Sequence, residues 1–205
     1  MGKIKKICLS ALLLAGIALA SACYVPDDFT GDVTIDKNGD FIIDYSGILT
    51  WAPFYGQIKE GKLAGEEKEK KIAAAEADLA RDTNFTEIES LGDAQFRVKY
   101  HREGKIKPNS LITFVRRDSF IMKIKADKTA STATFSGRWM TPEKAEQLVK
   151  YGLKVQGVFR VRTDAEVISS NASEVIKLKN GFTLYYWKVE GFSNTPPSLV
   201  VRLNP

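Results

Sequence analysis

The segment DKNGDFIIDY, residues 36–45, places carboxylate and amide side chains at the spacing of a calcium-binding loop. Positions one, three, five and nine of such a loop would be Asp36, Asn38, Asp40 and Asp44. A calcium loop also needs glycine at position six, for its sharp turn, and a bidentate glutamate at position twelve. Phe41 and Gly47 occupy these two places. The segment therefore lacks two features that complete a calcium site.

The same segment has the pattern of a β-hairpin. Apolar residues alternate with polar ones on both sides of the loop, at Val33 and Ile35 before it and at Phe41 and Ile43 after it. Such alternation is typical of half-buried strands. Asn38-Gly39 is the dipeptide that best forms a two-residue type I′ turn. We therefore predict a hairpin with this turn, and we expect neither a metal nor another cofactor.

Residues suited to catalysis are few. His101 is the only histidine, and it lies in a basic stretch beside Arg102. No glycine-framed serine, helical pair of histidines or phosphate-binding loop accompanies it. Asp32 and the acids of the first hairpin are close in sequence, but spacing along strands does not place two carboxylates across a substrate. We expect His101 to be an exposed strand residue and the protein not to be an enzyme.

The N-terminus has the composition of an export signal. Three lysines precede a largely apolar run, residues 7–20, which is too short for a membrane span and typical of a signal peptide. Ala20-Ser21-Ala22-Cys23 resembles the lipobox of bacterial lipoproteins, in which cleavage before the cysteine leaves a lipidated N-terminus; that family prefers leucine in place of Ala20. Cleavage by ordinary signal peptidase would instead leave a free Cys23. We expect lipidation, because it gives the sole mature cysteine a role.

Charge is unevenly distributed along the mature chain. Residues 23–93 include 7 basic and 16 acidic residues, whereas residues 94–205 include 20 basic and 9 acidic ones. Such asymmetry indicates either that the two halves face each other or that one half presents a charged surface to a partner. Basic clusters can bind nucleic acid, but export to the cell envelope argues against that partner.

Apolar and basic residues alternate over much of the chain, which predicts antiparallel strands with one wet face. Examples are FRVKY from Phe96, FIMKIK from Phe120 and FRVR from Phe159. Residues 63–82 are rich in helix formers, and Thr141 and Pro142 are typical of the start of a second helix. We predict an α+β domain over residues 31–205, with two helices on a mainly antiparallel sheet, in two layers or as an open barrel. Residues 1–22 are the predicted signal peptide, and residues 23–30 a short tether.

Three aromatic residues are candidates for binding an apolar ligand. Trp51, Phe54 and Tyr55 surround Pro53, and proline ends the strand there, so that they are expected in or beside a loop. They would either fold back over the core or form a tip that faces the membrane or covers a ligand.

A second candidate group lies in VIKLKNGFTLYYWKV, residues 175–189, which predicts a hairpin with Asn180-Gly181 as its turn. The register that pairs residue 179 with residue 182 puts Ile176 on the core face with Tyr185. The opposite face then carries three apolar and three basic side chains: Phe182, Leu184, Tyr186, Lys177, Lys179 and Lys188. We expect the apolar ones to line a cavity and Lys177 and Lys179 to meet an anionic headgroup.

The end of the chain resembles the mycobacterial LppM family and related bacterial lipoproteins. The similarity is carried by VISSNASEV from Val167, the second hairpin turn and LYYWKV, and chiefly by Ser170, Asn171, Ala172, Gly181 and Trp187. The order of elements is also similar, although many relatives continue into a C-terminal membrane helix that this sequence does not show. The resemblance implies a β-rich domain that binds lipids or glycolipids in an apolar groove.

We therefore expect a bacterial lipoprotein held to the membrane by its lipid anchor, whose domain binds a lipid or another apolar envelope molecule without catalysis. Tyr24, rather than aspartate, follows the cysteine, which favours the periplasmic face of the outer membrane in a cell with two membranes. The alternative is a scaffold or assembly partner that docks another envelope protein through a charge-split surface.

Overall fold

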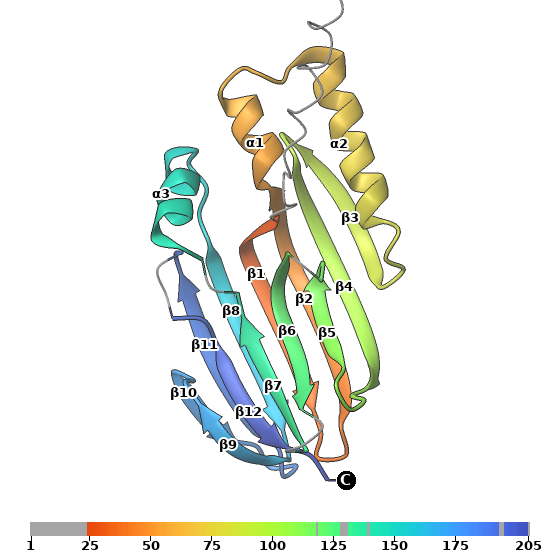
Figure 1. The fold of residues 1–205 in the computed structure, drawn as a ribbon, viewed down its shortest axis with the longest axis vertical. Coiled ribbons are helices and arrows are strands. Elements are labelled where there is room, and N and C mark those ends of the chain that lie inside the picture. Colours follow the sequence, from red (N-terminus) through yellow and green to blue (C-terminus); the bar gives the residue numbers. More distant parts are fainter. Residues whose placement is uncertain (1–23, 118, 128–130, 139, 193–194, 205) are drawn as a thin grey trace, which may run out of the picture.

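Two β-sheets face each other in the computed structural model, which describes residues 24–117, 119–127, 131–138, 140–192 and 195–204 (Figure 1). Among these residues, the larger sheet has seven strands, in the order β10 (Glu174–Lys177), β11 (Thr183–Glu190), β8 (Gln156–Thr163), β1 (Tyr24–Ile35), β2 (Asp40–Trp51), β4 (Gln95–Lys105) and β3 (Phe85–Gly92). In the same described part of the chain, the smaller sheet has five strands, in the order β5 (Leu111–Val115), β6 (Phe120–Asp127), β7 (Thr132–Gly137), β12 (Ser198–Arg202) and β9 (Glu166–Ser170). Only β1 and β8 pair in parallel within this described part. The predicted α+β fold dominated by antiparallel strands is thus confirmed, in its two-layer form.

Three helices in the described part lie toward the end of the sandwich where β1 begins (Figure 1): α1 (Ala52–Lys59), α2 (Gly65–Leu79) and α3 (Pro142–Lys150). The last two are the predicted helices, and the hydroxyl of Thr141 caps α3 by accepting the Lys144 N–H at 3.4 Å. The first, α1, replaces a predicted loop. Proline does end β2, but it stands in the first turn of a helix, where its missing N–H is not needed.

The residues expected to form a tether belong instead to β1. Tyr24, Val25 and Phe29 are buried, and the strand pairs with β2 from its first residue. A β-bulge between Asp27 and Thr30 interrupts the alternation of apolar and polar residues. The sequence pattern therefore does not predict a strand here. The domain therefore begins at Tyr24, while the predicted signal peptide and Cys23 lie outside the described residues.

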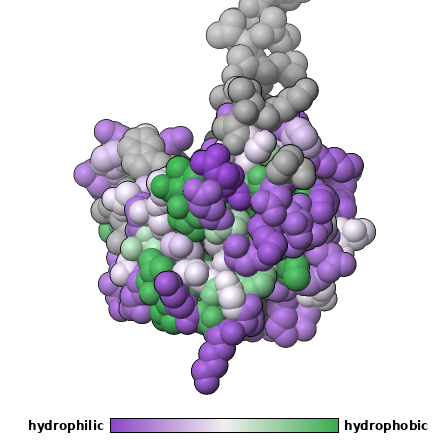
Figure 2. All heavy atoms as spheres, turned by 90° about the horizontal axis from the view of Figure 1, so that it is seen from below, coloured by the Kyte–Doolittle hydropathy of each residue, from purple (hydrophilic) through white to green (hydrophobic). Residues whose placement is uncertain are grey.

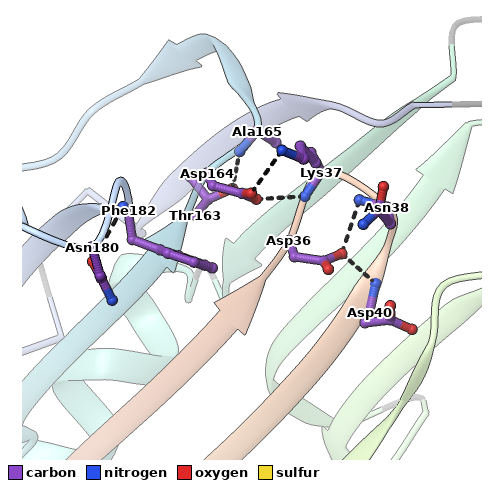
Figure 3. Close-up of polar contacts among 9 residues, drawn as sticks. All are labelled: Asp36, Lys37, Asn38, Asp40, Thr163, Asp164, Ala165, Asn180 and Phe182. Atoms are coloured by element: carbon purple, nitrogen blue, oxygen red, sulfur yellow. Dashed lines mark hydrogen bonds and ion pairs between the residues drawn. The ribbon is translucent and has the colours of Figure 1, made fainter.

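The first predicted hairpin forms, with a longer loop than predicted. The Asp36 N–H donates to the Asp40 carbonyl at 3.0 Å, which leaves Lys37, Asn38 and Gly39 as a three-residue loop. Gly39 has φ of +84°, the left-handed conformation that closes such a loop. The Asp36 carboxylate accepts the N–H groups of Asn38 and Asp40 at 2.9 and 2.8 Å (Figure 3). This carboxylate therefore holds the turn.

The second predicted hairpin also forms, and its register differs from the prediction. The Leu178 N–H donates to the Phe182 carbonyl at 2.8 Å, so that its loop too has three residues. Ile176 consequently pairs with Leu184, not with Tyr185. The prediction that Ile176 shares the core face is wrong, because one extra loop residue turns every side chain of β10 to the other face.

Aromatic and aliphatic side chains fill the space between the sheets. Phe96, Phe114 and Phe135 are fully buried there. No helix among the described residues has the length and apolar character to cross a membrane.

Candidate functional site

The structure separates the two groups of residues that the sequence offered as one binding site. Trp51 pairs with Tyr24, at the beginning of β1. Leu184 pairs with Arg162, which pairs with Thr34 near the end of β1. Thr34 lies ten residue steps beyond Tyr24 along β1, which is about 33 Å of extended strand. The two groups therefore lie toward opposite ends of the larger sheet.

The aromatic group folds over the core, which is the first of the two alternatives considered for it. The ring of Trp51 stacks on Phe54 at 4.0 Å and faces Tyr24 at 6.0 Å, measured between centroids. Tyr55 is buried in α1, and Lys59 lies over its ring at 5.0 Å.

The hairpin group lies on the outer face and the edge of the larger sheet. Leu184 and Tyr186 are half-buried on the face opposite to Trp187, and Phe182 precedes β11. Lys177 and Lys179 are exposed. None of the eight predicted ligand-binding residues lines the cleft that the fold creates.

That cleft lies between the two sheets, at the end where β1 and β8 begin and β7 and β11 end. It has a volume of about 80 Å³. Most of its lining is apolar: Tyr24, Pro26, Phe29, Ile121, Gly137, Met140, Val155, Phe159, Val189, Gly191, Phe192, Pro196 and Pro197, together with Thr195 and Arg138. Five strands and the segment before β12 contribute, so residues far apart in sequence form one wall.

Two glycines make room for the aromatic rings at the inner end of the cleft. Phe29 and Phe159 contact each other with centroids 4.9 Å apart. A Cβ atom on Gly157 would lie within 3.0 Å of the ring and the carbonyl oxygen of Phe29, and one on Gly31 would lie 2.8 Å from the ring of Phe159. Any larger side chain at these strand positions would displace the rings, so glycine sets the shape of the cleft.

A wider groove of about 680 Å³ adjoins the cleft and runs along α3. The groove and the cleft share Val155, Gly191 and Phe192. Apolar and charged residues line the groove together: Ala145, Val149, Leu153, Glu146, Lys150, Lys154 and Glu190. The cleft thus continues into an open channel with an apolar floor and a charged rim.

Few of the described residues that line the cleft have polar side chains. Among the described lining residues, Arg138 alone is charged, and it donates to the hydroxyl of Ser119 at 3.1 Å. Burial raises the pKa of Tyr24 to about 12, an effect that nearby Arg116 opposes and Asp78 reinforces. The tyrosine wall of the cleft is therefore neutral at physiological pH, and its one cation can meet an anionic group.

The two halves of opposite charge face each other across the strands of the larger sheet. On the outer face, acids of β1, β2 and β3 pair with bases of β4 and β8: Asp32 with Arg160 and Arg162, Asp40 with Lys105, Asp44 with His101, Glu87 with Lys99, and Glu89 with Arg97. This is the first of the two alternatives that the charge distribution left open. The ion pairs remove much of the basis for a charge-split docking surface.

His101 is an exposed residue of β4, as predicted. Its Nδ1 lies 2.7 Å from the Asp44 carboxylate, and this hydrogen bond, together with the negative charge, raises the pKa of the imidazole. A groove of about 320 Å³ on this sheet face includes Asp32 as well. Within the described part of the chain, no three His, Cys, Asp or Glu side chains gather closely enough to hold a metal ion.

Sequence reasoning missed the cleft for a local reason. The sequence predicts a tether at Tyr24, Pro26 and Phe29, and Phe192, Pro196 and Pro197 lie in a segment without period-two alternation. A signal was present in the glycines: isolated Gly31 and Gly157 within strand patterns mark places where another group approaches closely.

Comparisons with known proteins find similarity among solved structures. No protein-family model and no curated protein matches the chain. Among solved structures, the NMR structure of the folded domain of LppM from Mycobacterium tuberculosis is similar, with a TM-score of 0.44 and 10% sequence identity, over 92% of this chain and 95% of that chain.

Proposed function

We propose that the protein is a lipid-anchored envelope protein that holds the acyl chain of a lipid, or a similar apolar molecule, in the cleft between its sheets. One observation carries this proposal: an apolar cleft with a single cation continues into an open groove. This arrangement supports binding of an amphiphile, whose chain would extend from the cleft along the adjoining groove of about 680 Å³ while its anionic group meets Arg138.

The chemistry of the lining favours binding over catalysis. Phe29, Phe159 and Phe192 offer apolar contact area, and burial of each methylene group of a chain contributes about 0.8 kcal/mol. The lining residues named above supply packing and one positive charge. We therefore propose that the protein binds its ligand without catalysis.

The anchor is proposed from the sequence, since Cys23 lies outside the described residues. The position of Cys23 in the sequence supports the same function. Tyr24 is the next residue, and both Tyr24 and Pro26 line the cleft. A lipid on Cys23 would therefore tether the cleft itself to the membrane.

A second candidate function, docking of an envelope protein, is favoured by a different observation. Ile168 of β9 and Val175 and Ile176 of β10 are 47%, 57% and 45% exposed, and both strands are sheet edges. Figure 2 views the molecule from the end with the β1–β2 hairpin, where hydrophobic side chains are visible among hydrophilic ones. Exposed apolar residues on an unpaired edge are typical of sites that accept a partner strand.

Native mass spectrometry with lipid extraction would test the proposed function. The protein would be purified from bacterial membranes as wild type and as two variants, Phe192→Glu in the cleft and Leu184→Glu on the outer face of β11. We expect a stoichiometric lipid on the wild type and on Leu184→Glu, and its loss from Phe192→Glu at an unchanged circular dichroism spectrum. A wild-type protein that carries no lipid, and takes none up from added phospholipid, would contradict the proposal. Loss from Leu184→Glu alone would move the site to the outer face.

A further inference from the structure

We infer that the face formed by α3 contacts the anionic surface of the bilayer, so that the groove beside α3 opens onto the membrane. The inference rests on the proposed function, because it takes Cys23 as the anchor. It adds the surface of the protein that meets the membrane and the chemistry of that contact.

The described fold begins next to the proposed anchor residue. β1 begins at Tyr24, whose pairing with Trp51 fixes it at the end of the larger sheet. One residue spans at most about 3.6 Å, so an anchor on Cys23 leaves no linker between the lipid and the sandwich. The end that carries α1, α2 and α3 would consequently lie at the headgroups (Figure 1).

α3 presents an exposed apolar side chain with lysines beside it. The helix buries Ala145 and Leu148 against the domain, whereas Val149 is 58% exposed, more than the other exposed large apolar side chains of the described residues. Lys150 and Lys154 lie beside it on the groove, both exposed. No carboxylate of the described residues forms an ion pair with either lysine. An exposed apolar side chain beside unpaired lysines suits the interface of an anionic bilayer.

Contacts with the end of α1 hold α3 in place. Its C-cap residue Tyr151 donates its hydroxyl to the Glu60 carboxylate, just after α1, at 2.5 Å. The Tyr151 ring also packs where a Cβ on Gly56 would lie only 2.9 Å away. These contacts hold α1 and α3 together, which fixes the orientation of α3.

The other end of the sandwich supplies a matched control. Val175 is 57% exposed on β10, and Lys177 and Lys179 follow it, exposed and likewise without an ion-pair partner among the described residues. The sites at Val149 and Val175 thus have the same apolar residue, nearly the same exposed fraction and two exposed lysines each. They differ in their distance from Tyr24, because β10 pairs with the part of β11 that lies near the end of β1.

The experiment places an environment-sensitive fluorophore at each site of the membrane-purified protein. Val149→Cys and Val175→Cys would be labelled with a nitrobenzoxadiazole group and reconstituted into vesicles of 70% phosphatidylcholine and 30% phosphatidylglycerol. We expect a blue shift, and quenching by a headgroup-region doxyl lipid, at position 149 and not at position 175. Each lysine near an anionic surface contributes about fivefold in binding. Lys150→Glu with Lys154→Glu should therefore abolish the shift, while Lys177→Glu with Lys179→Glu should leave it unchanged.

Equal emission from the two labels, or equal quenching, would overturn the inference. Lipid extraction of the same preparations separates it from the proposed function. A protein that carries a lipid without a shift at position 149 retains the proposed function and loses this membrane face. A shift at position 149 on a protein without bound lipid retains the membrane face and contradicts the cleft as a lipid site.

Discussion

The side-chain oxygen of Asn171 accepts the indole N–H of the buried Trp187 at 2.8 Å. The same oxygen accepts the backbone N–H of Ser198 at 2.8 Å, and the amide nitrogen donates to the Pro196 carbonyl at 2.9 Å. Asn171 lies between β9 and β10, so one amide group joins a strand of the larger sheet to the segment that leads into the smaller one. Pro196 lines the cleft, which means that this amide also positions a wall of the candidate site.

Replacement of Asn171 by alanine should destabilise the fold. It leaves the indole N–H of Trp187 without its acceptor in the interior, which costs about 1–3 kcal/mol. We expect a loss of about 2 kcal/mol in the free energy of unfolding, measured by urea denaturation. Asn180→Ala is the control, since Asn180 accepts the Phe182 N–H at 3.3 Å in an exposed turn. Equal midpoints for the two variants would contradict the role given to Asn171.

Gly157→Ala should disrupt the cleft from its inner end. The added methyl group would meet both the ring and the backbone oxygen of Phe29, so that β1 and β8 would have to separate. Overpacking of this kind costs about 1–3 kcal/mol, and we expect the upper end of that range because backbone is involved. Gly104→Ala is the matched strand variant, whose methyl would meet only the Phe41 ring, at 3.1 Å. Thermal unfolding would decide, and a smaller loss for Gly157→Ala than for Gly104→Ala would refute the account.

Tyr45→Phe should stabilise the protein. The Tyr45 hydroxyl is buried and has no hydrogen-bond partner among the described residues, and burial raises the pKa of this phenol well above 10. Removal of an unsatisfied buried hydroxyl should add about 1 kcal/mol to the free energy of unfolding. Tyr151→Phe removes a hydroxyl that is bonded to Glu60, and should lower stability slightly. Denaturant titrations that give both variants the same sign would argue against this assignment.

The ion pair of His101 and Asp44 should give a small dependence of stability on pH. The hydrogen bond and the negative charge of Asp44 raise the pKa of His101 in the folded state above its ordinary value of about 6.5. The contribution of this ion pair to the free energy of unfolding is therefore fully present below pH ~6.5. It is lost as the pH rises through the folded-state pKa of His101. An NMR titration of the imidazole should give a higher pKa in the wild type than in Asp44→Asn. Identical values would show that the carboxylate does not act on the ring.

Local patterns in the sequence were sufficient for elements whose partners lie nearby in the chain. The helices that cover residues 65–79 and 142–150 follow from helix formers and a capping threonine, and both hairpins follow from alternation around an Asn-Gly dipeptide. Loop length was harder to predict, because glycine supplies a left-handed residue equally well to a two-residue or a three-residue loop. That single-residue difference decided the face of Ile176.

The sequence by itself determined the class of fold, the two predicted helices, the hairpins and the exposed position of His101. Only the tertiary structure decided the candidate site. The parallel pairing of Phe29 with Gly157 and the approach of residues 195–197 bring together segments far apart in the chain. No local period encodes such pairing, because side-chain alternation states which residues face inward but not which strand they face. The cleft therefore arises from the contacts between strands, whereas the strands arise from the sequence.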